Sequence, residues 1–209
     1  MKKNFSAPLR LRASALNSES FAGLILAGGE GKRWGGPKAW AELEDGRTFL
    51  EACAATLVGA GASPVVATLP PRTETPPIEG LDGIALPEAG MDMFGSLQTG
   101  LVRLVETPGW QKVAVLPVDH PLVHAGSIAD LVGATALAAI PSYRGKHGHP
   151  VCLARSVVER IVSGELDGPT LREVLRSVEA VDVPVDDVGI ITNCNTPDAL
   201  RVALRANEE

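Results

Sequence analysis

A short stretch of the chain, residues 27–38, combines several glycines with three cationic side chains. The glycines are Gly28, Gly29, Gly31, Gly35 and Gly36, and the cations are Lys32, Arg33 and Lys38. Glycine lets the backbone turn sharply and bring its N–H groups close to an oxyanion, while Arg and Lys donate charged hydrogen bonds to phosphate. We therefore expect this stretch to bind a polyphosphate, although a glycine-rich turn with solvated charges would have the same composition.

Two common phosphate-binding loops do not fit this stretch. The P-loop pattern G-x-x-x-x-G-K-[ST], placed on Gly31 and Lys32, has Leu26 at its first glycine and Arg33 at its last position. The dinucleotide pattern G-x-G-x-x-G, started at Gly29, has Trp34 at its third glycine. A dinucleotide-dependent oxidoreductase is therefore the weakest of the functions considered.

A carboxylate, Asp119, follows the apolar run Val113–Leu116. A hard cation such as Mg²⁺ is often held by one or two carboxylates together with substrate phosphates, so Asp119 is a candidate metal ligand. The alternative is a helix-capping Asp before Pro121. His120 and His124 have the i, i+4 spacing of a zinc pair, but Pro121 lies between them and no third ligand is apparent.

Three further segments carry polar groups. Tyr143–Pro150 crowds Arg144, Lys146 and His149 between two expected strands, where they could face an anionic substrate or form an ordinary hairpin turn. In Asn193–Pro197, Thr196 is expected to cap the last helix, with Pro197 in its first turn. In Met91–Gly100, Ser96 is a plausible helix cap.

The pattern of apolar residues predicts strands that alternate with helices. Expected strands are 21–26, 64–69, 112–116, 138–140 and 150–153, and expected helices are 48–59, 94–105, 155–162, 170–178 and 196–205. Residues 70–77 are expected to be a proline-rich surface loop. This alternation predicts an α/β fold, a Rossmann-like three-layer sandwich whose mostly parallel central sheet binds ligands at the carboxyl ends of its strands.

Composition limits the remaining possibilities. A chain of 209 residues with 45% hydrophobic residues is expected to form one domain, residues 21–209, preceded by a basic extension, residues 1–20. The net charge of −6 argues against a protein that binds nucleic acid through bulk positive charge. Three widely spaced cysteines, the lack of a long apolar run and the absence of a signal-peptide pattern indicate a cytoplasmic protein without a membrane anchor.

The glycine stretch resembles the N-terminal signature of MobA-like nucleotidyltransferases, a family that includes molybdenum cofactor guanylyltransferases and related cytidylyltransferases. The signature is L-A-G-G-x-x-x-R-x-G-x-x-K, and it is matched by Leu26, Ala27, Gly28, Gly29, Arg33, Gly35 and Lys38. D-x-P at Asp119, G-S-L-x-x-G at Gly95, Y-x-G-x-x-G-H-P at Tyr143 and N-x-N-T-P at Asn193 also resemble family motifs. The resemblance spans residues 21–206, and it departs from the family at Gly31, where many members carry Ser.

The resemblance implies the nucleotide-diphospho-sugar transferase type of sandwich and assigns roles to residues. Arg33, Lys38 and Asp119 would be catalytic, and Asp119 would bind Mg²⁺. The nucleotide would contact Leu26, Ala27, Gly28, Gly29, Gly31, Arg33, Lys38, Gly95, Ser96 and Asp119. The acceptor would contact Tyr143, Arg144, His149, Asn193 and Asn195.

The implied reaction moves a nucleoside monophosphate from GTP or CTP to a phosphate-bearing acceptor, most simply a molybdopterin, and releases pyrophosphate. The motifs disagree on the base, because LAGG and NCNTP resemble guanylyltransferases whereas GSLQTG and YRGKHGHP resemble cytidylyltransferases. A sugar- or polyol-phosphate acceptor is the alternative. A non-catalytic nucleotide-binding module is another, since Asn195 stands where cytidylyltransferase-like members often have Asp. The protein is expected to be a monomer or a homodimer.

Overall fold

The computed structural model describes residues 20–166 and 170–206, so most of the expected N-terminal extension lies outside the described residues. The strands are β1 (Phe21–Leu26), β2 (Val65–Leu69), β3 (Leu81–Ala85), β4 (Lys112–Pro117), β5 (Ala138–Tyr143), β6 (Lys146–His147), β7 (Val151–Ala154) and β8 (Val181–Pro184). The helices are α1 (Phe49–Gly59), α2 (Met93–Val105), α3 (Ala125–Gly133), α4 (Arg155–Val162), α5 (Leu171–Ser177) and α6 (Pro197–Ala206). None of the helices within these residues is long and apolar enough to span a membrane.

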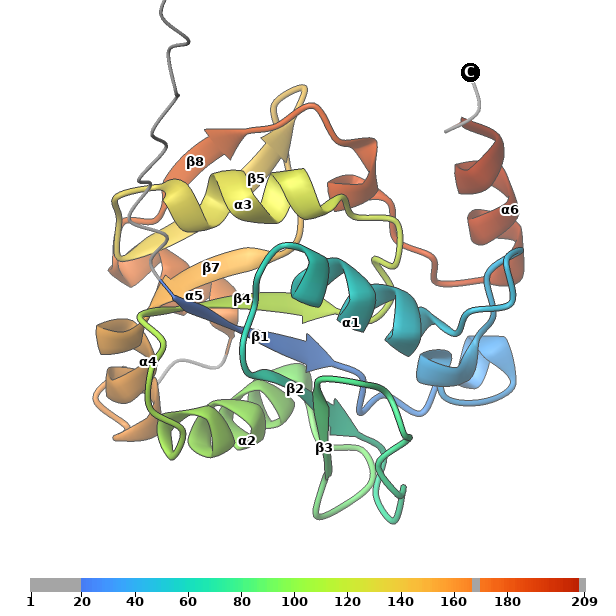
Figure 1. Cartoon of the computed structure of the whole chain (residues 1–209), viewed down its shortest axis with the longest axis horizontal. Helices are drawn as coiled ribbons and strands as arrows, with labels where there is room; N and C mark the ends of the chain where they lie inside the picture. Colours follow the sequence, from blue (N-terminus) through green and yellow to red (C-terminus); the bar gives the residue numbers. More distant parts are fainter. Residues whose placement is uncertain (1–19, 167–169, 207–209) are drawn as a thin grey trace, which may run out of the picture.

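The described strands form one mixed sheet with the order β3-β2-β1-β4-β7-β5-β6, and β8 pairs with β5 (Figure 1). The strands β3, β2, β1 and β4 are parallel, as expected. The expected parallel core is therefore present, and in the other half β7 runs antiparallel to both β4 and β5. The hairpin turn expected near Tyr143 joins β5 to β6.

Helices cover both faces of the sheet, which gives the expected three layers (Figure 1). On one face α1, α3 and α6 bury residues such as Leu57, Ile128 and Leu200. On the other face α2, α4 and α5 bury Leu101 and Val158, among others. β1, β2 and β4 are buried along their whole length, because helices pack on both sides of them.

Local sequence signals explain several of the element ends. Thr48 and Glu51 form a reciprocal capping box at the start of α1. Thr196 Oγ1 accepts a hydrogen bond from the Ala199 backbone N–H at 3.1 Å, so this residue caps α6 as expected. The expectation that Ser96 caps α2 is wrong: Asp92 is the cap, and Ser96 lies inside the helix, buried against Thr68.

Four of the strands and α-helices within the described residues were not expected from the sequence: β3, α3, β6 and β8. The residues of β3 are only half-buried and include Gly83, so no apolar alternation marks the strand. No side chain of its own caps α3; instead the buried Asp187 accepts hydrogen bonds from the His124 backbone N–H and the Ser127 hydroxyl. Such a long-range cap leaves no local signal in the sequence.

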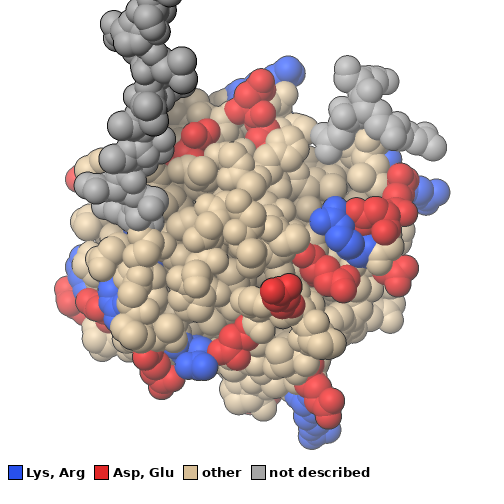
Figure 2. Space-filling view, viewed as in Figure 1, with Lys and Arg blue, Asp and Glu red and all other residues tan. Residues whose placement is uncertain are grey.

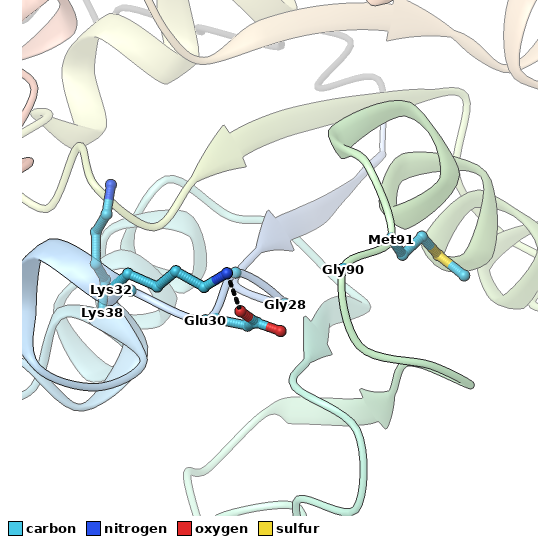
Figure 3. Close-up of a pocket in the computed structure, with 8 residues that line it drawn as sticks. Gly28, Glu30, Lys32, Lys38, Gly90 and Met91 are labelled. Carbon is cyan, nitrogen blue, oxygen red and sulfur yellow. Dashed lines mark ion pairs between the residues drawn. The ribbon is translucent and has the colours of Figure 1, made fainter.

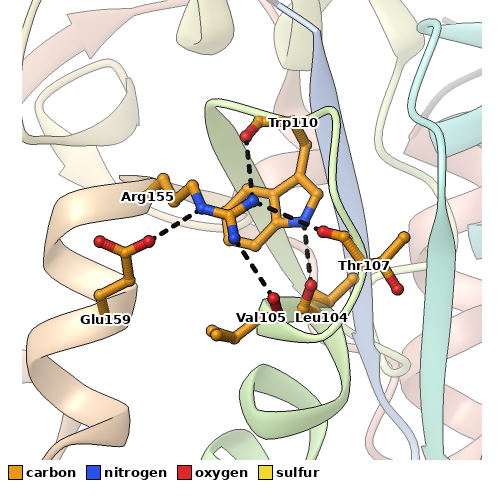
Figure 4. Close-up of polar contacts among 6 residues, drawn as sticks. All are labelled: Leu104, Val105, Thr107, Trp110, Arg155 and Glu159. Atoms are coloured by element: carbon orange, nitrogen blue, oxygen red, sulfur yellow. Dashed lines mark hydrogen bonds and ion pairs between the residues drawn. The ribbon is translucent and has the colours of Figure 1, made fainter.

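The carboxyl end of α2 is held by Arg155, the first residue of α4 (Figure 4). Its guanidinium stacks 4.5 Å from the ring centroid of Trp110 and donates to the Val105 carbonyl at 3.2 Å. Longer contacts of 3.5 Å reach the carbonyls of Thr107 and Trp110. Trp110 is fully buried, and its indole N–H donates to the Leu104 carbonyl at 3.0 Å. One side chain therefore bonds the last carbonyl of α2 and reaches two carbonyls of the loop that follows the helix.

We predict that Arg155→Ala lowers the free energy of unfolding by about 2 kcal/mol, because buried carbonyls lose their donors and Trp110 loses its stacking partner. Arg155→Lys should recover little of this loss, since an ammonium has neither the several N–H donors of a guanidinium in fixed positions nor a planar group that can stack on Trp110. Urea denaturation measures both variants.

Arg160→Ala is the matched control, because the Arg160 pair with Glu165 is exposed and should contribute less than about 1 kcal/mol. An Arg155→Ala protein as stable as Arg160→Ala would contradict the capping role.

Candidate active site

The glycine stretch follows β1 and folds back on itself. The Val118 backbone N–H donates to the Leu26 carbonyl at 3.1 Å and the Ala27 N–H to the Thr68 carbonyl at 3.0 Å, so the chain stays paired until Gly28. Gly31 has φ +61°, and a Cβ there would lie 1.9 Å from the Gly36 carbonyl oxygen. This turn therefore requires glycine at residue 31.

Two adjoining cavities open beside this loop. The first, of about 330 Å³, lies between the loop and the Gly90–Met91 segment (Figure 3). Its lining residues are Gly28, Gly29, Glu30, Gly31, Lys32, Lys38, Gly90 and Met91. The second, of about 220 Å³, reaches from the loop to Asp119; besides Gly28, Gly29, Lys38 and Met91 it is lined by Leu26, Asp92, Met93, Ser96, Pro117 and Val118. Together they form one cleft at the carboxyl ends of β1 and β4.

Lys38 connects the loop to the end of β4 and to the segment before α6. Its ammonium donates to Asp119 Oδ2 at 2.8 Å and also to Asn195 Oδ1. The side chains of Lys38 and Asp119 are 18% and 16% exposed, so the ion pair is mostly shielded from water. The parallel pairing of β1 with β4 brings the loop and the carboxylate to the same edge of the sheet.

This pairing governs the charge of Asp119. Burial alone would raise the pKa of Asp119, but the hydrogen bond and the charge of Lys38 outweigh it and lower that pKa below its ordinary value. Asp119 is therefore a carboxylate at neutral pH. Burial, together with the neighbouring charge of Asp119, raises the pKa of the Cys194 thiol to about 11, so this cysteine remains a thiol.

Two histidines lie next to Asp119. The rings of His120 and His149 meet edge to face with centroids 4.9 Å apart, and Nδ1 of each is buried without a hydrogen-bonding protein partner. Burial lowers the pKa of His120. Burial and then the neighbouring His120 lower the pKa of His149 to about 4. Both rings are therefore neutral at pH 7. His124, the other member of the i, i+4 pair with His120, has its Nδ1 3.7 Å from Asp187 Oδ1.

The oxygens around Lys38 fit a hard cation only in part. Within residues 20–166 and 170–206, no group of three or more His, Cys, Asp or Glu side chains could hold a metal ion. Asp119 supplies one carboxylate and Asn195 one neutral oxygen, both now bonded to Lys38. Mg²⁺ is often bound by one or two carboxylates with substrate phosphates and water, so this donor set suits a metal that arrives with a phosphate ligand.

The structure brings most of the expected nucleotide residues together. Leu26, Gly28, Gly29, Gly31, Lys38, Ser96 and Asp119 line the cleft. Ala27 and Gly95 line neither cavity; Ala27 is buried and Gly95 donates its N–H to Asp92. The side chain of Arg33 lies outside the described residues.

The expected acceptor residues are more dispersed. Asn195 bonds to Lys38 and His149 packs on His120, so both adjoin Asp119. The Arg144 guanidinium lies 5.0 Å from the Tyr143 ring centroid at the β5–β6 turn, and neither residue lines the two cavities. Asn193 is exposed.

Sequence reasoning singled out the segment Met91–Gly100 but named only Gly95 and Ser96 as contacts within it. Met91, Asp92 and Met93 also line the cleft. Trp34, which interrupts the dinucleotide pattern, donates its indole N–H to the Cys194 carbonyl at 3.1 Å. No sequence signal predicts that contact between residues 160 positions apart.

The histidine pair predicts a pH-dependent stability. Because the pKa of His149 is lowered to about 4, the unfolded chain binds more protons than the native protein between that value and about 6.5. The free energy of unfolding should therefore fall as the pH falls from 7 to 5, by on the order of 2 kcal/mol from this residue. His149→Phe, which keeps a ring against His120, should remove much of that fall in urea titrations at both pH values.

His147→Asn, a change at an exposed histidine, serves as the control and should keep the wild-type dependence on pH. A His149→Phe protein with an unchanged pH dependence would show that the buried ring is protonated in the native state.

Comparison with known proteins identifies relatives of this chain and of its fold. A probable molybdenum cofactor guanylyltransferase of Opitutus terrae is 26% identical over 192 residues, which cover 87% of this chain and 94% of the relative. The structure of Rv0371c from Mycobacterium tuberculosis H37Rv superposes with a TM-score of 0.73 at 20% identity, covering 90% of this chain and 99% of the other. That protein has also been solved in complex with manganese.

A second fold relative is the 2-C-methyl-D-erythritol 4-phosphate cytidylyltransferase of Thermus thermophilus, with a TM-score of 0.63 at 20% identity over 90% of this chain and 99% of the other. These structures share the mixed sheet with its parallel core. A model of the MobA-like NTP transferase domain matches residues 23–193, which include the glycine loop, Asp119 and the His149 segment. The chain therefore belongs to the family of MobA-like NTP transferases.

Proposed function

We propose that the protein is a Mg²⁺-dependent nucleotidyltransferase that moves a nucleoside monophosphate from a nucleoside triphosphate to a phosphate-bearing acceptor. The observation that carries the proposal is the Lys38–Asp119 pair, which joins a basic glycine loop to a carboxylate at one edge of the sheet. The family supplies the substrate class, a nucleoside triphosphate. The buried free thiols of Cys53, Cys152 and Cys194 suit the reducing cytoplasm proposed as its location.

The two cavities differ in character, and this difference supports one orientation of the nucleotide. The first is lined by glycine backbone, Lys32 and Lys38, with Glu30 paired to Lys32; its backbone N–H groups and two ammonium groups suit the β- and γ-phosphates. The second contains Leu26, Met93 and the Ser96 hydroxyl, which suit a ribose and a base. Asp92, at the start of α2, would repel phosphate from that end of the cleft.

The reaction that fits this arrangement is an in-line displacement at the α-phosphorus. A phosphate oxygen of the acceptor attacks the α-phosphorus, the bond to the bridging oxygen breaks, and pyrophosphate leaves with that electron pair. Because a phosphate nucleophile is already ionised at pH 7, no general base is required. Catalysis then rests on positioning and on neutralising charge.

Each group of residues has a separate task in this mechanism. The N–H groups of the glycine loop and Lys38 hold the leaving phosphates, with Arg33 as a further donor. Asp119 and Asn195 would hold Mg²⁺, which when bound neutralises charge on the phosphate oxygens. His120 and His149 exclude water beside Asp119 and offer uncharged rings to the acceptor. Tyr143, Arg144 and Asn193 would contact the more distant part of the acceptor.

Guanine is the base we propose, with a molybdopterin as the acceptor. The curated relative from Opitutus terrae is named as a probable molybdenum cofactor guanylyltransferase, and the N-x-N-T-P motif at Asn193–Pro197 resembles such enzymes. CTP as the donor, or a sugar or polyol phosphate as the acceptor, is the alternative that the G-S-L and G-H-P motifs support.

A matrix of substrates tests this choice. Each of the four nucleoside triphosphates is incubated with Mg²⁺ and either molybdopterin, a polyol phosphate or a sugar phosphate, and pyrophosphate release is measured. We expect the highest kcat/KM for GTP with molybdopterin. A higher value with CTP would make the protein a cytidylyltransferase, and turnover only with the simple phosphates would exclude molybdopterin.

A thermal-shift titration of the protein with the same four nucleoside triphosphates tests the alternative that it is a non-catalytic binding module. A ligand that binds only the native state raises Tm. A rise in Tm with a triphosphate, without pyrophosphate release from any pair, would overturn the enzymatic proposal in favour of a binding module.

Asp119→Asn tests the central carboxylate. We expect pyrophosphate release to fall about 100-fold or more, because the charge that holds the metal is lost from the reacting centre. The protein should remain folded by circular dichroism, since the Asn amide oxygen can still accept from Lys38. Stability should fall moderately, because the Lys38 ammonium loses its counter-charge.

Asp130→Asn is the matched control, because Asp130 is exposed on α3. It should leave turnover unchanged. Near-normal turnover in Asp119→Asn would contradict the assignment of Asp119 as a metal ligand.

A further inference from the structure

Trp34 lies within the glycine stretch, but its side chain contacts other parts of the chain. The indole N–H donates to the Cys194 carbonyl at 3.1 Å, and the ring meets Phe49 of α1 edge to face at 5.4 Å. Phe49 and Cys194 are fully buried, so both partners are fixed by the core. The indole therefore anchors a glycine-rich segment to rigid surroundings.

The anchor belongs to a closed set of contacts around the candidate site. The Cys194 backbone N–H donates to the Asp119 carbonyl at 2.8 Å, which ties the segment before α6 to the end of β4. The next residue, Asn195, accepts from Lys38. The glycine stretch is thus held at two points, Trp34 and Lys38, by two adjacent residues of one distant segment.

The stretch needs such anchors because of its composition. Five glycines give residues 28–36 a large conformational entropy, which must be lost before their N–H groups can converge on a phosphate. Inside the stretch the Trp34 N–H bonds to the Gly31 carbonyl at 2.7 Å and the Gly35 N–H to the Lys32 carbonyl at 3.4 Å. The Lys32–Glu30 ion pair is exposed on both sides and contributes little.

We propose that Trp34 is a positioning residue that latches the glycine loop in its phosphate-receiving shape before any ligand binds. The latch acts through the loop backbone and touches no reacting atom. Because the loop is already ordered before the ligand binds, ligand binding does not have to supply the free energy of ordering it, and loss of the Trp34 contact weakens binding. The placement of Asp119 and Asn195 is kept by Lys38 and Cys194. The ligand class, a polyphosphate, rests on the proposed function; the latch itself does not.

Trp34→Phe is the test, because it removes the indole N–H and keeps an aromatic ring against Phe49. Trp110→Phe is the matched control: it removes an indole N–H that donates to the Leu104 carbonyl at 3.0 Å, on the opposite face of the sheet. Circular dichroism and Tm establish that both variants fold. A Tm loss in the control equal to or larger than that in Trp34→Phe excludes general destabilisation as the cause of any loop effect.

Hydrogen exchange of the ligand-free proteins measures the latch directly. We expect the amides of Trp34 and Gly35 to exchange about tenfold faster in Trp34→Phe and at the wild-type rate in Trp110→Phe. In calorimetry with inorganic triphosphate, Kd should rise about fivefold in Trp34→Phe alone. In turnover, KM for the nucleoside triphosphate should rise by a similar factor, with kcat changed less than about twofold.

Unchanged exchange at Trp34 and Gly35, or an unchanged Kd for triphosphate, would overturn the latch. The latch would also be overturned if Trp110→Phe changed the exchange rates and Kd as much as Trp34→Phe does. A fall in kcat at constant KM in Trp34→Phe would overturn it as well. A wild-type protein that binds no triphosphate would count against the proposed function, whereas the exchange rates would still decide whether Trp34 holds the loop.

Discussion

The ion pair between Lys38 and Asp119 is the interaction on which the site depends. An ammonium and a carboxylate that are both about five-sixths buried must compensate each other's lost hydration, so each fixes the position of the other. The pair can form only because β1 and β4 are parallel neighbours, which brings the ends of both strands to one edge. Asn195 completes the arrangement by giving the ammonium a neutral acceptor. Loop, strand and terminal helix are therefore organised around one charge pair.

Much of the fold could be predicted because its signals are local. The apolar run Phe21–Leu26 gives β1, and Thr48 with Glu51 gives the start of α1. The elements that escaped prediction depend on distant groups. The start of α3 relies on Asp187, which lies about sixty positions away, and β3 is too exposed to show a pattern. Asp92, rather than Ser96, caps α2, since a buried hydroxyl inside the helix pairs with Thr68 instead.

The candidate site divides in the same way. Glycines after a strand, Lys38 and Asp119 could be recognised because their residue types carry the chemistry and their spacing is local. His149 can be assigned to the site only through the family resemblance, because a residue that precedes a strand reaches this edge only if that strand runs antiparallel, as β7 does beside β4. The hydrogen bond from Trp34 to the Cys194 carbonyl depends on the position of the segment before α6, which no local sequence pattern encodes.

The reversal of strand direction at β4 has a consequence for how two substrates can meet. β4 has a parallel neighbour, β1, on one side and an antiparallel neighbour, β7, on the other. The loop that leaves β1 and the loop that enters β7 therefore lie at the same edge of the sheet. Displacement at phosphorus requires the entering and leaving oxygens to lie roughly in line on opposite sides of the atom. Asp119 lies between the two flanks, so in the proposed reaction the nucleotide and the acceptor would approach the phosphorus from opposite sides.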